Sequence, residues 1–314
     1  MAGGQPSISS GRLTTLQATP LAVALRLLKR VPLHAAVITI VALWSVPTLA
    51  LAVSSFREAT AITSSGWWNA ALAPLDFTLD NYTRVLDQRG MGQAFLNSLI
   101  ITVPSTALVI LVASFAAYAF AWMRFPMRNG MFLILVGLLV VPLQMTLIPV
   151  LRLYSATSTS AEMPILGGRV FGVGSFPAMW LAHTAYGLPF AIYLLRNFFG
   201  GLPRDLTEAA YLDGASDLGV LFRVILPLAR PAIAALTIFQ FLWVWNDLLV
   251  ALVFLGDPSL APMTLRITNL VSSFGGSYQL LTAAAFVSMA LPLAIFFVLQ
   301  RYFVEGLLAG AIKG

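Results

Sequence analysis

Long apolar runs, separated by short polar segments, dominate the chain. Each run free of Asp, Glu, Lys and Arg can hold the ~20 residues that a helix needs to cross ~30 Å of hydrocarbon. Strands of a β-barrel would alternate apolar and polar positions, and continuous runs such as Leu108–Ala113 do not alternate. The pattern therefore predicts an all-α membrane protein of six transmembrane helices, near residues 34–56, 95–119, 131–153, 176–199, 230–255 and 280–303.

Polar tails flank this predicted membrane domain of residues 31–303. The tail of residues 1–30 is rich in Gly, Ser and Thr up to about Thr19, a composition typical of disorder. A second tail follows at residues 304–314. The first apolar run is longer than the ~7–15 residues of a signal peptide, so we interpret it as a retained helix.

Composition supports lipid as the main solvent of this surface. Hydrophobic residues make up 59% and charged residues 10% of the 314 positions, whereas soluble domains carry ~25% charged residues. The net charge of +6 comes from scattered basic residues, which argues against a nucleic-acid stripe. The absence of cysteine and the two histidines predict no disulfide and no metal site.

Basic residues also predict the orientation, because cytoplasmic loops are enriched in Lys and Arg. With a cytoplasmic N-terminus, the outer side holds only Arg57, Arg84, Arg89, Arg152, Arg169 and Arg266. The cytoplasmic side holds Arg12, Arg26, Lys29, Arg30, Arg124, Arg128, Arg196, Arg204, Arg223, Arg230, Arg301 and Lys313. Six spans then place both termini in the cytoplasm.

Proline recurs within the predicted spans. Each proline removes a backbone donor and tends to kink its helix. A kinked membrane helix persists only where neighbours or a cavity satisfy the freed carbonyl. Functional bending and irregular packing both remain open for Pro47, Pro104, Pro142, Pro149, Pro189 and Pro292.

An unusually polar cytoplasmic segment, residues 202–227, lies between the fourth and fifth predicted spans. We expect two short helices joined by a turn. Asp205, with Glu208 three residues later, predicts an N-terminal capping box for the first helix. Gly214 allows the positive φ that ends this helix, and Ser216 can cap the second.

The second helix carries an apolar stripe. Leu218, Leu221, Phe222 and Ile225 recur at i, i+3, i+4 and i+7, a spacing that predicts one shared face, and Pro227 is expected to end the pattern. Such a stripe either lies back on the protein's own membrane helices or docks another protein. These residues alone leave both interpretations open.

The same segment resembles the EAA motif of permeases from ATP-binding-cassette (ABC) importers. Glu208-Ala209-Ala210, three residues, Gly214, nine residues, then Val224-x-Leu226-Pro227 matches that motif, with Val224 in place of its Ile. The resemblance implies a type I importer permease fold, whose coupling helix docks into a cleft of a separate ATPase. It assigns ATPase coupling to Glu208, Ala209, Ala210, Asp213, Gly214, Leu226 and Pro227.

The resemblance extends from about Asn81 to Gly314. Leu181–Asn197, Phe239–Gly256 and Leu299–Gly314 are similar to carbohydrate permeases of the maltose-system G-subunit type, and most similar to α-glucoside permeases. This implies import of a sugar, an α-glucoside or a related oligosaccharide. The loop of residues 155–174 is longer than usual in that family.

By the same resemblance, the C-terminal tail reaches between the two ATPase subunits. The residues expected to contact them are Gly306, Gly310 and Lys313. Without the resemblance, a frayed terminus is the simpler interpretation.

Asp247 is the only acid within a predicted span. An intramembrane carboxylate is costly and faces the protein interior or a cavity. Asn246 or Gln240 is expected to share its hydrogen bonds, in a structural role or in the translocation pathway. The candidate pathway residues are His183, Tyr186, Gln240, Trp243, Asn246 and Asp247. For His183 with Tyr186 a core pair, and for Trp243 a membrane-interface position, remain the alternatives.

No motif of a catalytic site is present. The sequence lacks Gly-x4-Gly-Lys-Ser/Thr, His-Glu-x-x-His and Gly-x-Ser-x-Gly. We therefore expect a transport subunit without enzymatic activity or cofactor, with ATP and Mg bound by partner ATPase subunits. The predicted partners are two such subunits, a second homologous permease, an extracytoplasmic sugar-binding protein and the inner-membrane lipid bilayer.

Three alternatives compete with this interpretation. An ATPase-independent secondary transporter or channel usually carries several ionisable groups at the membrane midplane, whereas only Asp247 qualifies here. A non-transporting scaffold would leave the segment of residues 202–227 without a purpose. Relatives with the same motif import glycerol phosphate, so the resemblance leaves that substrate open.

Overall fold

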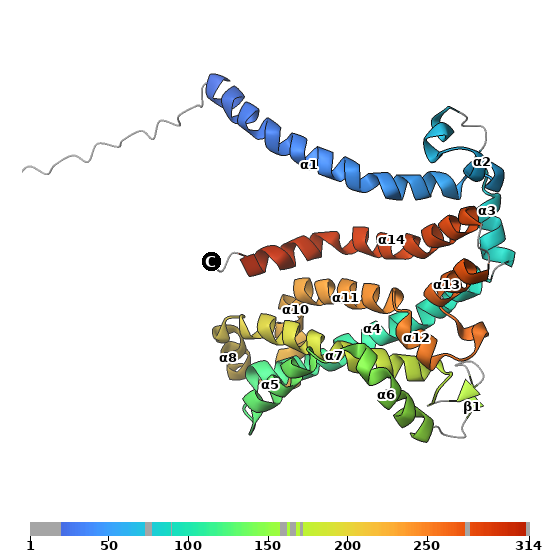
Figure 1. Ribbon diagram of the computed structural model, residues 1–314. Coiled ribbons are helices and arrows are strands. Elements are labelled where there is room, and N and C mark those ends of the chain that lie inside the picture. Colours follow the sequence, from blue (N-terminus) through green and yellow to red (C-terminus); the bar gives the residue numbers. More distant parts are fainter. Residues whose placement is uncertain are drawn as a thin grey trace, which may run out of the picture. The chain divides into compact units, whose positions relative to one another are not determined.

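The computed structural model describes residues 20–72, 77–88, 90–157, 162–163, 168–169, 172–273 and 277–311, and these residues are almost entirely helical (Figure 1). The first half carries α1 (Pro20–Ser55), α2 (Ala59–Ser64), the 3₁₀ helix η1 (Trp67–Ala71), α3 (Asp80–Thr83), the π-helix η3 (Arg84–Gln88), α4 (Met91–Trp122), α5 (Arg128–Leu138) and α6 (Leu143–Thr157). Two short strands, β1 (Glu162–Met163) and β2 (Gly168–Arg169), pair antiparallel within the segment of residues 155–174.

The second half begins with α7 (Phe176–Gly200) and α8 (Arg204–Leu212). It continues with α9 (Asp217–Val220), the π-helix η5 (Leu221–Ile225), α10 (Leu226–Leu228), α11 (Arg230–Trp245), α12 (Leu249–Phe254), the 3₁₀ helix η6 (Pro258–Leu260), α13 (Met263–Ser273) and α14 (Tyr278–Ala311). The chain divides into two compact units between Leu51 and Ala52, and the packing described below is that of the second unit.

Within the described residues, four helices are long and apolar enough to cross a membrane: Val31–Ser55, Met91–Trp122, Phe176–Gly200 and Tyr278–Gln300. Two bent helix pairs raise the number to six, if each pair is one span. The first pair joins Arg128–Leu138 to Leu143–Ala156 and the second joins Asp217–Leu228 to Arg230–Trp245. The first, second, fourth and sixth apolar runs of the sequence thus correspond to continuous helices, and the third and fifth to interrupted ones.

The third predicted span is not one continuous helix, so that prediction was wrong. α5 and α6 meet at 104°. Pro142 precedes α6, and the residue before a proline is disfavoured in the helical conformation. The helix therefore stops near Leu138 and resumes at Leu143 in a new direction.

The fifth predicted span, residues 230–255, is also interrupted. α11 ends at Trp245 and α12 begins at Leu249, so Asn246, Asp247 and Leu248 lie outside both helices. α11 turns by 77° from the helix that ends at Leu228. The chain therefore enters this span through one bend and leaves it through a second break.

The terminal helices are longer than predicted. α1 begins at Pro20 rather than near residue 34, because the Leu- and Ala-rich stretch before Val31 continues the helix. α14 runs to Ala311, so most of the predicted separate tail at residues 304–314 is helical backbone.

Two tryptophans satisfy carbonyls that prolines leave free. Pro104 in α4 has no N–H to offer the carbonyl of Ile100, one turn earlier. The Trp180 Nε1–H of α7 donates to that oxygen at 2.7 Å. In α14, Pro292 likewise frees the Ser288 carbonyl, which accepts from Trp245 Nε1–H of α11 at 3.0 Å. Both freed carbonyls are thus satisfied from a neighbouring span, as the need for internal backbone satisfaction in lipid requires.

Small residues allow the central helices to approach closely. The buried cluster shared by α4, α7 and α11 includes Ala113, Ala117, Ala191 and Ala232. Lipid tails are as apolar as Leu, so helix association in membranes relies on such close packing rather than on the hydrophobic effect. Large residues such as Phe199 and Leu236 fill the remaining space of the cluster.

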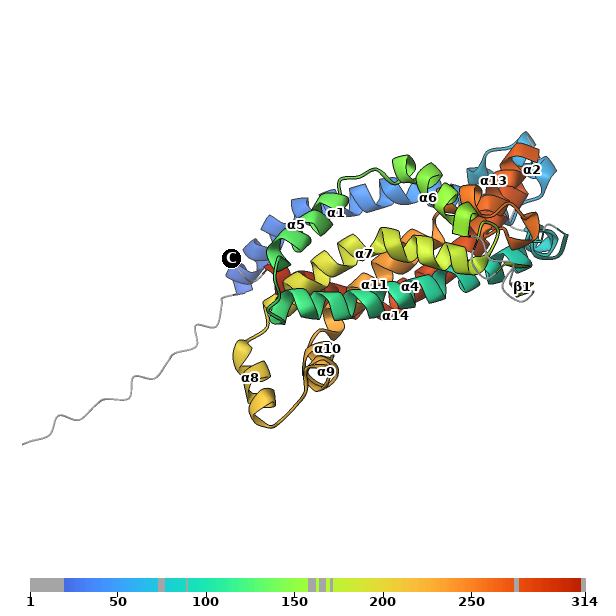
Figure 2. The same cartoon turned by 90° about the horizontal axis from the view of Figure 1, so that it is seen from below.

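The second unit has two distinct ends. α8 and α10 lie at one end of α4, α7 and α11, together with the last turns of α14, whereas α2, α3, α13 and β1 lie at the other (Figure 1). Figure 2 shows α8, α9 and α10 projecting from the helix bundle at the first end. The polar segment of residues 202–227 is therefore far from the predicted outer loops.

Candidate functional site

The segment of residues 202–227 forms the predicted helix pair, but its first helix starts differently. Pro203 is the residue before α8, with φ −60° and ψ 132°, and its side chain makes no cap. Because α8 begins at Arg204, Asp205 lies inside the first turn and the predicted capping box with Glu208 was wrong. A carboxylate in the first turn still favours the helix dipole.

The end of α8 is closed as the sequence predicts. Gly214 has φ +82°. Its N–H donates to the Tyr211 carbonyl at 3.0 Å, and the Ala215 N–H donates to the Ala210 carbonyl at 3.0 Å. This pair of bonds is a Schellman motif, which reverses the chain within two residues.

Tyr211 connects α8 to its surroundings. Its hydroxyl donates to Asp217 Oδ1 at 2.7 Å and lies 2.9 Å from the hydroxyl of Tyr118 in α4. Desolvation, followed by the hydrogen bonds to Tyr118 and Asp217, raises the pKa of Tyr211 well above its ordinary value. The phenol therefore keeps its proton at neutral pH and holds the turn between α8 and α9.

The second helix of the segment departs from the predicted single stripe. Ser216 caps it, as predicted, by accepting from the Gly219 N–H at 3.3 Å. The next turn is the π-helix η5, in which the Leu226 N–H bonds to the Leu221 carbonyl. A π-turn shifts side chains relative to the 3.6-residue period. Leu221 and Ile225 are consequently buried, whereas Leu218 and Phe222 are 59% and 51% exposed.

Pro227 does not end the helix, contrary to prediction. The helix continues through α10 to Leu228, and the break falls at Ala229. Proline is acceptable here because the π-turn already alters the bonding pattern ahead of it. Leu226 and Pro227 are half-buried. They therefore lie where the segment joins the helix bundle and not on its exposed surface.

The outer surface of α8 offers a small apolar face with an acid. Glu208, Ala209, Leu212, Asp213 and Gly214 are exposed, whereas Ala210 packs toward the core. Leu212 is 89% exposed, and Leu218 and Phe222 lie on the neighbouring helix. Exposed leucines on a projecting polar segment, next to an acid that a basic partner can pair with, suit a protein-docking surface.

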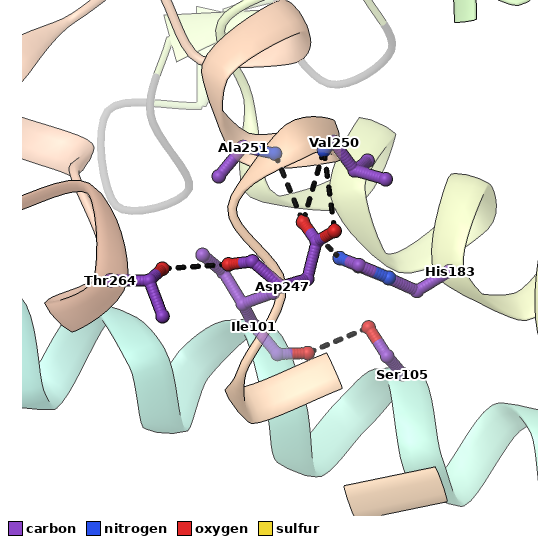
Figure 3. Close-up of polar contacts among 7 residues, drawn as sticks. All are labelled: Ile101, Ser105, His183, Asp247, Val250, Ala251 and Thr264. Carbon is purple, nitrogen blue, oxygen red and sulfur yellow. Dashed lines mark hydrogen bonds and ion pairs between the residues drawn. The ribbon is translucent and has the colours of Figure 1, made fainter. Parts of the chain in front are cut away.

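Asp247 lies in the break between α11 and α12, where its side chain and its carbonyl both accept hydrogen bonds (Figure 3). Its carboxylate accepts from the Val250 N–H at 3.1 Å and from the Ala251 N–H at 3.2 Å. Its own carbonyl accepts from the Thr264 hydroxyl at 2.6 Å. Asp247 thus caps α12 and ties the break to α13, while the helix N-terminus stabilises its charge.

His183 approaches the same carboxylate from α7. Its Nε2 lies 3.8 Å from Asp247 Oδ2, too far for a hydrogen bond. The imidazole is 1% exposed, and among the described residues neither of its nitrogens has a hydrogen-bond partner. A cavity of about 10 Å³, about one water molecule in size, is lined by both side chains and by Ser98 and Thr102.

The other candidate pathway residues are not all gathered here. The Trp243 ring stands edge-on to His183, with 6.0 Å between centroids. The Tyr186 hydroxyl instead accepts from Thr146 of α6 at 3.1 Å, so the predicted pairing of His183 with Tyr186 is replaced by a contact between spans. Asn246 is exposed, and its Nδ2 donates to the Leu242 carbonyl at 2.8 Å.

Gln240 occupies a space left by a glycine. A Cβ at Gly187 would meet the Gln240 amide at 2.7 Å, so α7 and α11 approach here only because Gly187 has no side chain. Gln240 is 4% exposed, and no partner for its Nε2 lies among the described residues. The prediction that Asn246 or Gln240 shares the hydrogen bonds of Asp247 was wrong, since backbone amides take that place.

Several residues that position the break escaped prediction. Ser98 accepts from the Met263 N–H at 2.9 Å, and Asn97 donates to the Ser259 and Ala261 carbonyls. These bonds hold α13 and the segment before it against α4, while Thr264 ties α13 to the break. No motif marks them, although small hydroxyl residues inside apolar helices are a general signal of helix–helix hydrogen bonds.

The described residues contain no group of three or more His, Cys, Asp or Glu able to hold a metal. Of the C-terminal positions proposed to contact an ATPase, Gly306 and Gly310 lie in the last turns of α14, and Lys313 lies outside the described residues.

Comparisons with known proteins agree with this architecture. Residues 93–308 match the family described as "Binding-protein-dependent transport system inner membrane component". The chain is 53% identical over 289 residues to the osmoprotective compounds uptake permease protein GgtD of Synechocystis, covering 91% of this chain and 93% of that protein. It is 54% identical over 248 residues to the alpha-glucoside transport system permease protein AglG of Rhizobium meliloti, covering 78% of this chain and 62% of that protein.

Among solved structures, a bacterial ABC transporter that imports the acidic polysaccharide alginate is similar in fold. The TM-score is 0.69 at 21% sequence identity, over 86% of this chain and 95% of the matched chain.

Proposed function

The chain belongs to the binding-protein-dependent transport system inner membrane component family, and from this membership we propose that it is the permease subunit of an ABC importer for a neutral sugar. The substrate class is an α-glucoside or a related oligosaccharide. The protein is a transport subunit and not an enzyme. The relative named as an alpha-glucoside permease supports this class, and the relative named for uptake of osmoprotective compounds supports an import function.

The observation that carries the proposal is the projecting segment of residues 202–227. α8 ends in a tight Schellman turn, is anchored through Tyr211, and leaves Glu208, Ala209 and Leu212 exposed. A rigid, exposed helix at one end of a membrane bundle suits force transmission from a soluble partner. By the family resemblance, its EAA residues are the ones that contact the ATPase.

The proposed mechanism is alternating access. ATP, with Mg, closes two separate ATPase subunits, and their closure draws together the coupling helices of this chain and of a second homologous permease. The broken spans then open the cavity toward the outer side, where an extracytoplasmic sugar-binding protein delivers the sugar. We place the protein in the inner membrane with both termini in the cytoplasm, in agreement with the Lys and Arg distribution.

The competing functions are less well supported. Ion-coupled carriers usually hold several ionisable groups at the membrane midplane, whereas the carboxylate of Asp247 is occupied in capping α12. Import of glycerol phosphate needs cations for its phosphate. Among the described residues that line the cavity beside Asp247, His183 is the one basic side chain, which gives a phosphate little to bind.

Two substitutions at α8, a charge reversal and a change in its terminal turn, test the coupling to the ATPase. In cells that carry the complete importer, Glu208→Lys or Gly214→Pro should abolish ATP-dependent sugar uptake while the protein still inserts into the membrane. Glu58→Lys is the matched control, because Glu58 is an exposed acid at the opposite end and makes no cap hydrogen bond. Undiminished uptake in both α8 variants would exclude the docking role.

A substrate panel tests the transported class. Radiolabelled α-glucosides, β-glucosides, glycerol phosphate and a zwitterionic osmoprotectant are offered to cells with and without the importer. We expect ATP-dependent accumulation of α-glucosides. Accumulation of glycerol phosphate alone would replace the sugar assignment, and uptake that continues without the ATPase subunits would favour the secondary carrier.

A further inference from the structure

The break in the fifth span lies at membrane depth. α11 has 16 residues, so at 1.5 Å per residue its end lies about 24 Å from its start. That distance is less than the ~30 Å of hydrocarbon that a span crosses. Non-helical backbone at such depth is tolerated only where protein buries it or where it borders a water-filled cavity.

At this break the molecule is open. A cleft of about 490 Å³ lies between the break, α13 and α14, within the size range of small-molecule sites. Asn246 lines the cleft and is exposed. The lining residues are Asn246, Leu248, Thr264, Ile267, Thr268, Ala285, Ser288, Met289, Pro292 and Leu293.

The lining has the chemistry of a site for a neutral hydroxylated molecule. Among the described residues that line the cleft, none has an ionisable side chain. The hydroxyl protons of Thr264 and Thr268 are already donated to the carbonyls of Asp247 and Thr264. A hydroxyl oxygen that has donated its proton can still accept, and sugar hydroxyl donors match such acceptors. Met289 and Leu293 supply apolar surface for the C–H faces of a sugar ring.

We propose that this cleft is the wall of the translocation pathway that contacts the sugar. The inference rests on the importer function proposed above and names where in this chain the substrate is touched. Asn246 and the oxygens of Thr264, Thr268 and Ser288 bind its hydroxyls. An anionic substrate finds no donor-rich or cationic group here, so the cleft also selects against phosphate esters.

Uptake kinetics of the complete importer test the contacts. Thr268→Val and Ser288→Ala should each raise KM for the sugar about three- to tenfold, the loss expected for one hydrogen bond. Thr237→Val is the matched control, since it removes the same kind of bond to a carbonyl four residues earlier, outside the cleft. The basal ATPase rate should stay unchanged in Thr237→Val, because Thr237 lies neither in the cleft nor in the segment of residues 202–227.

The outcomes separate the two proposals. If wild-type importer accumulates no sugar of the panel, the function itself fails. If wild type imports sugar and the cleft variants match Thr237→Val in KM, the function stands and the cleft assignment is overturned.

Labelling tests whether water reaches the cleft. The chain has no cysteine, so Ser288→Cys or Thr268→Cys introduces a unique thiol for a membrane-impermeant thiol reagent. We expect labelling during turnover, and protection by the transported sugar. Absence of labelling would show that lipid or the second permease fills the cleft, and labelling without protection would show an aqueous space without sugar contact. Either result overturns the inference.

Discussion

Gly214 shows how one residue determines the shape of the segment of residues 202–227. Its φ of +82° is a conformation that L-residues rarely adopt, and nothing lies within 4 Å of the place where a Cβ would stand. A side chain here therefore meets conformational strain but no steric clash. The sequence alone predicts this residue, because the requirement is local.

Gly214→Ala should consequently destabilise the α8 turn by about 1–2 kcal/mol, the cost of the left-handed conformation for a residue with a Cβ. Hydrogen exchange of the α8 amides in the assembled importer measures this local opening, and sugar uptake should fall with it. Gly214→Asn should be milder, since Asn tolerates this conformation better.

Gly219→Ala provides the control for that experiment. A Cβ at Gly219 would meet Ser216 Oγ at 3.5 Å, an ordinary contact, and its φ is not positive. Exchange rates and uptake should remain at the wild-type level. Equal effects of the two alanines would contradict a conformational role for Gly214.

At the scale of elements, prolines in two spans are paired with tryptophans from neighbouring spans. Trp180 serves the carbonyl freed by Pro104, and Trp245 serves the carbonyl freed by Pro292. The sequence predicts that a partner is needed but cannot identify it, because the partner lies on another helix. Trp245 also stacks on Phe241, with ring centroids 5.5 Å apart, which fixes the direction of its indole.

A double-mutant cycle tests this pairing. Trp245→Phe leaves the Ser288 carbonyl unsatisfied and should lower the stability of the purified importer by about 1–3 kcal/mol. Adding Pro292→Ala restores an N–H within α14 that can bond to that carbonyl, so the double variant should recover much of the loss. Thermal unfolding in one detergent gives the interaction free energy.

Trp243→Phe is the control for this cycle, since Trp243 is 41% exposed and donates no such bond among the described residues. It should show little dependence on Pro292. Strictly additive effects of Trp245→Phe and Pro292→Ala would contradict the pairing.

For the whole molecule, apolar runs predict six membrane candidates and the structure confirms their order along the chain. What could not be predicted is their continuity. The break after Leu138 follows from Pro142, whose position is visible in the sequence, but the same sequence rule also fits the unbroken helices around Pro104 and Pro189. The break at Asp247 depends on Thr264 and the turn into α12, contacts that are distant in sequence.

The candidate site divides in the same way. Gly214 and Ser216 act through bonds within a few residues and were predicted correctly. Asp205 was assigned to the cap because the start of α8 was expected two residues later than it is, since Pro203 is the residue that precedes the helix. The partners of His183, Tyr186 and Gln240 come from other helices, so their surroundings required the folded chain.

Orientation can be tested on single-cysteine variants, because the chain has none of its own. Leu212→Cys, 89% exposed on α8, should react with an impermeant thiol reagent only from the cytoplasmic side. Leu72→Cys, 85% exposed at the opposite end, should react only from outside. Labelling of position 212 in intact cells would contradict the proposed topology and the contact with a cytoplasmic ATPase.

The single residue Ala229 joins α10 to α11, and the chain turns there by 77°. In the proposed mechanism, the segment of residues 202–227 and the fifth span would therefore move together about Ala229. Because α11 is about 24 Å long, a tilt of about ten degrees imposed by the ATPase would displace Trp245 sideways by about 4 Å. In the proposed mechanism that displacement would reach the indole that donates to the Ser288 carbonyl of α14, so movement of α8 would be transmitted along the chain through α9, η5, α10 and α11.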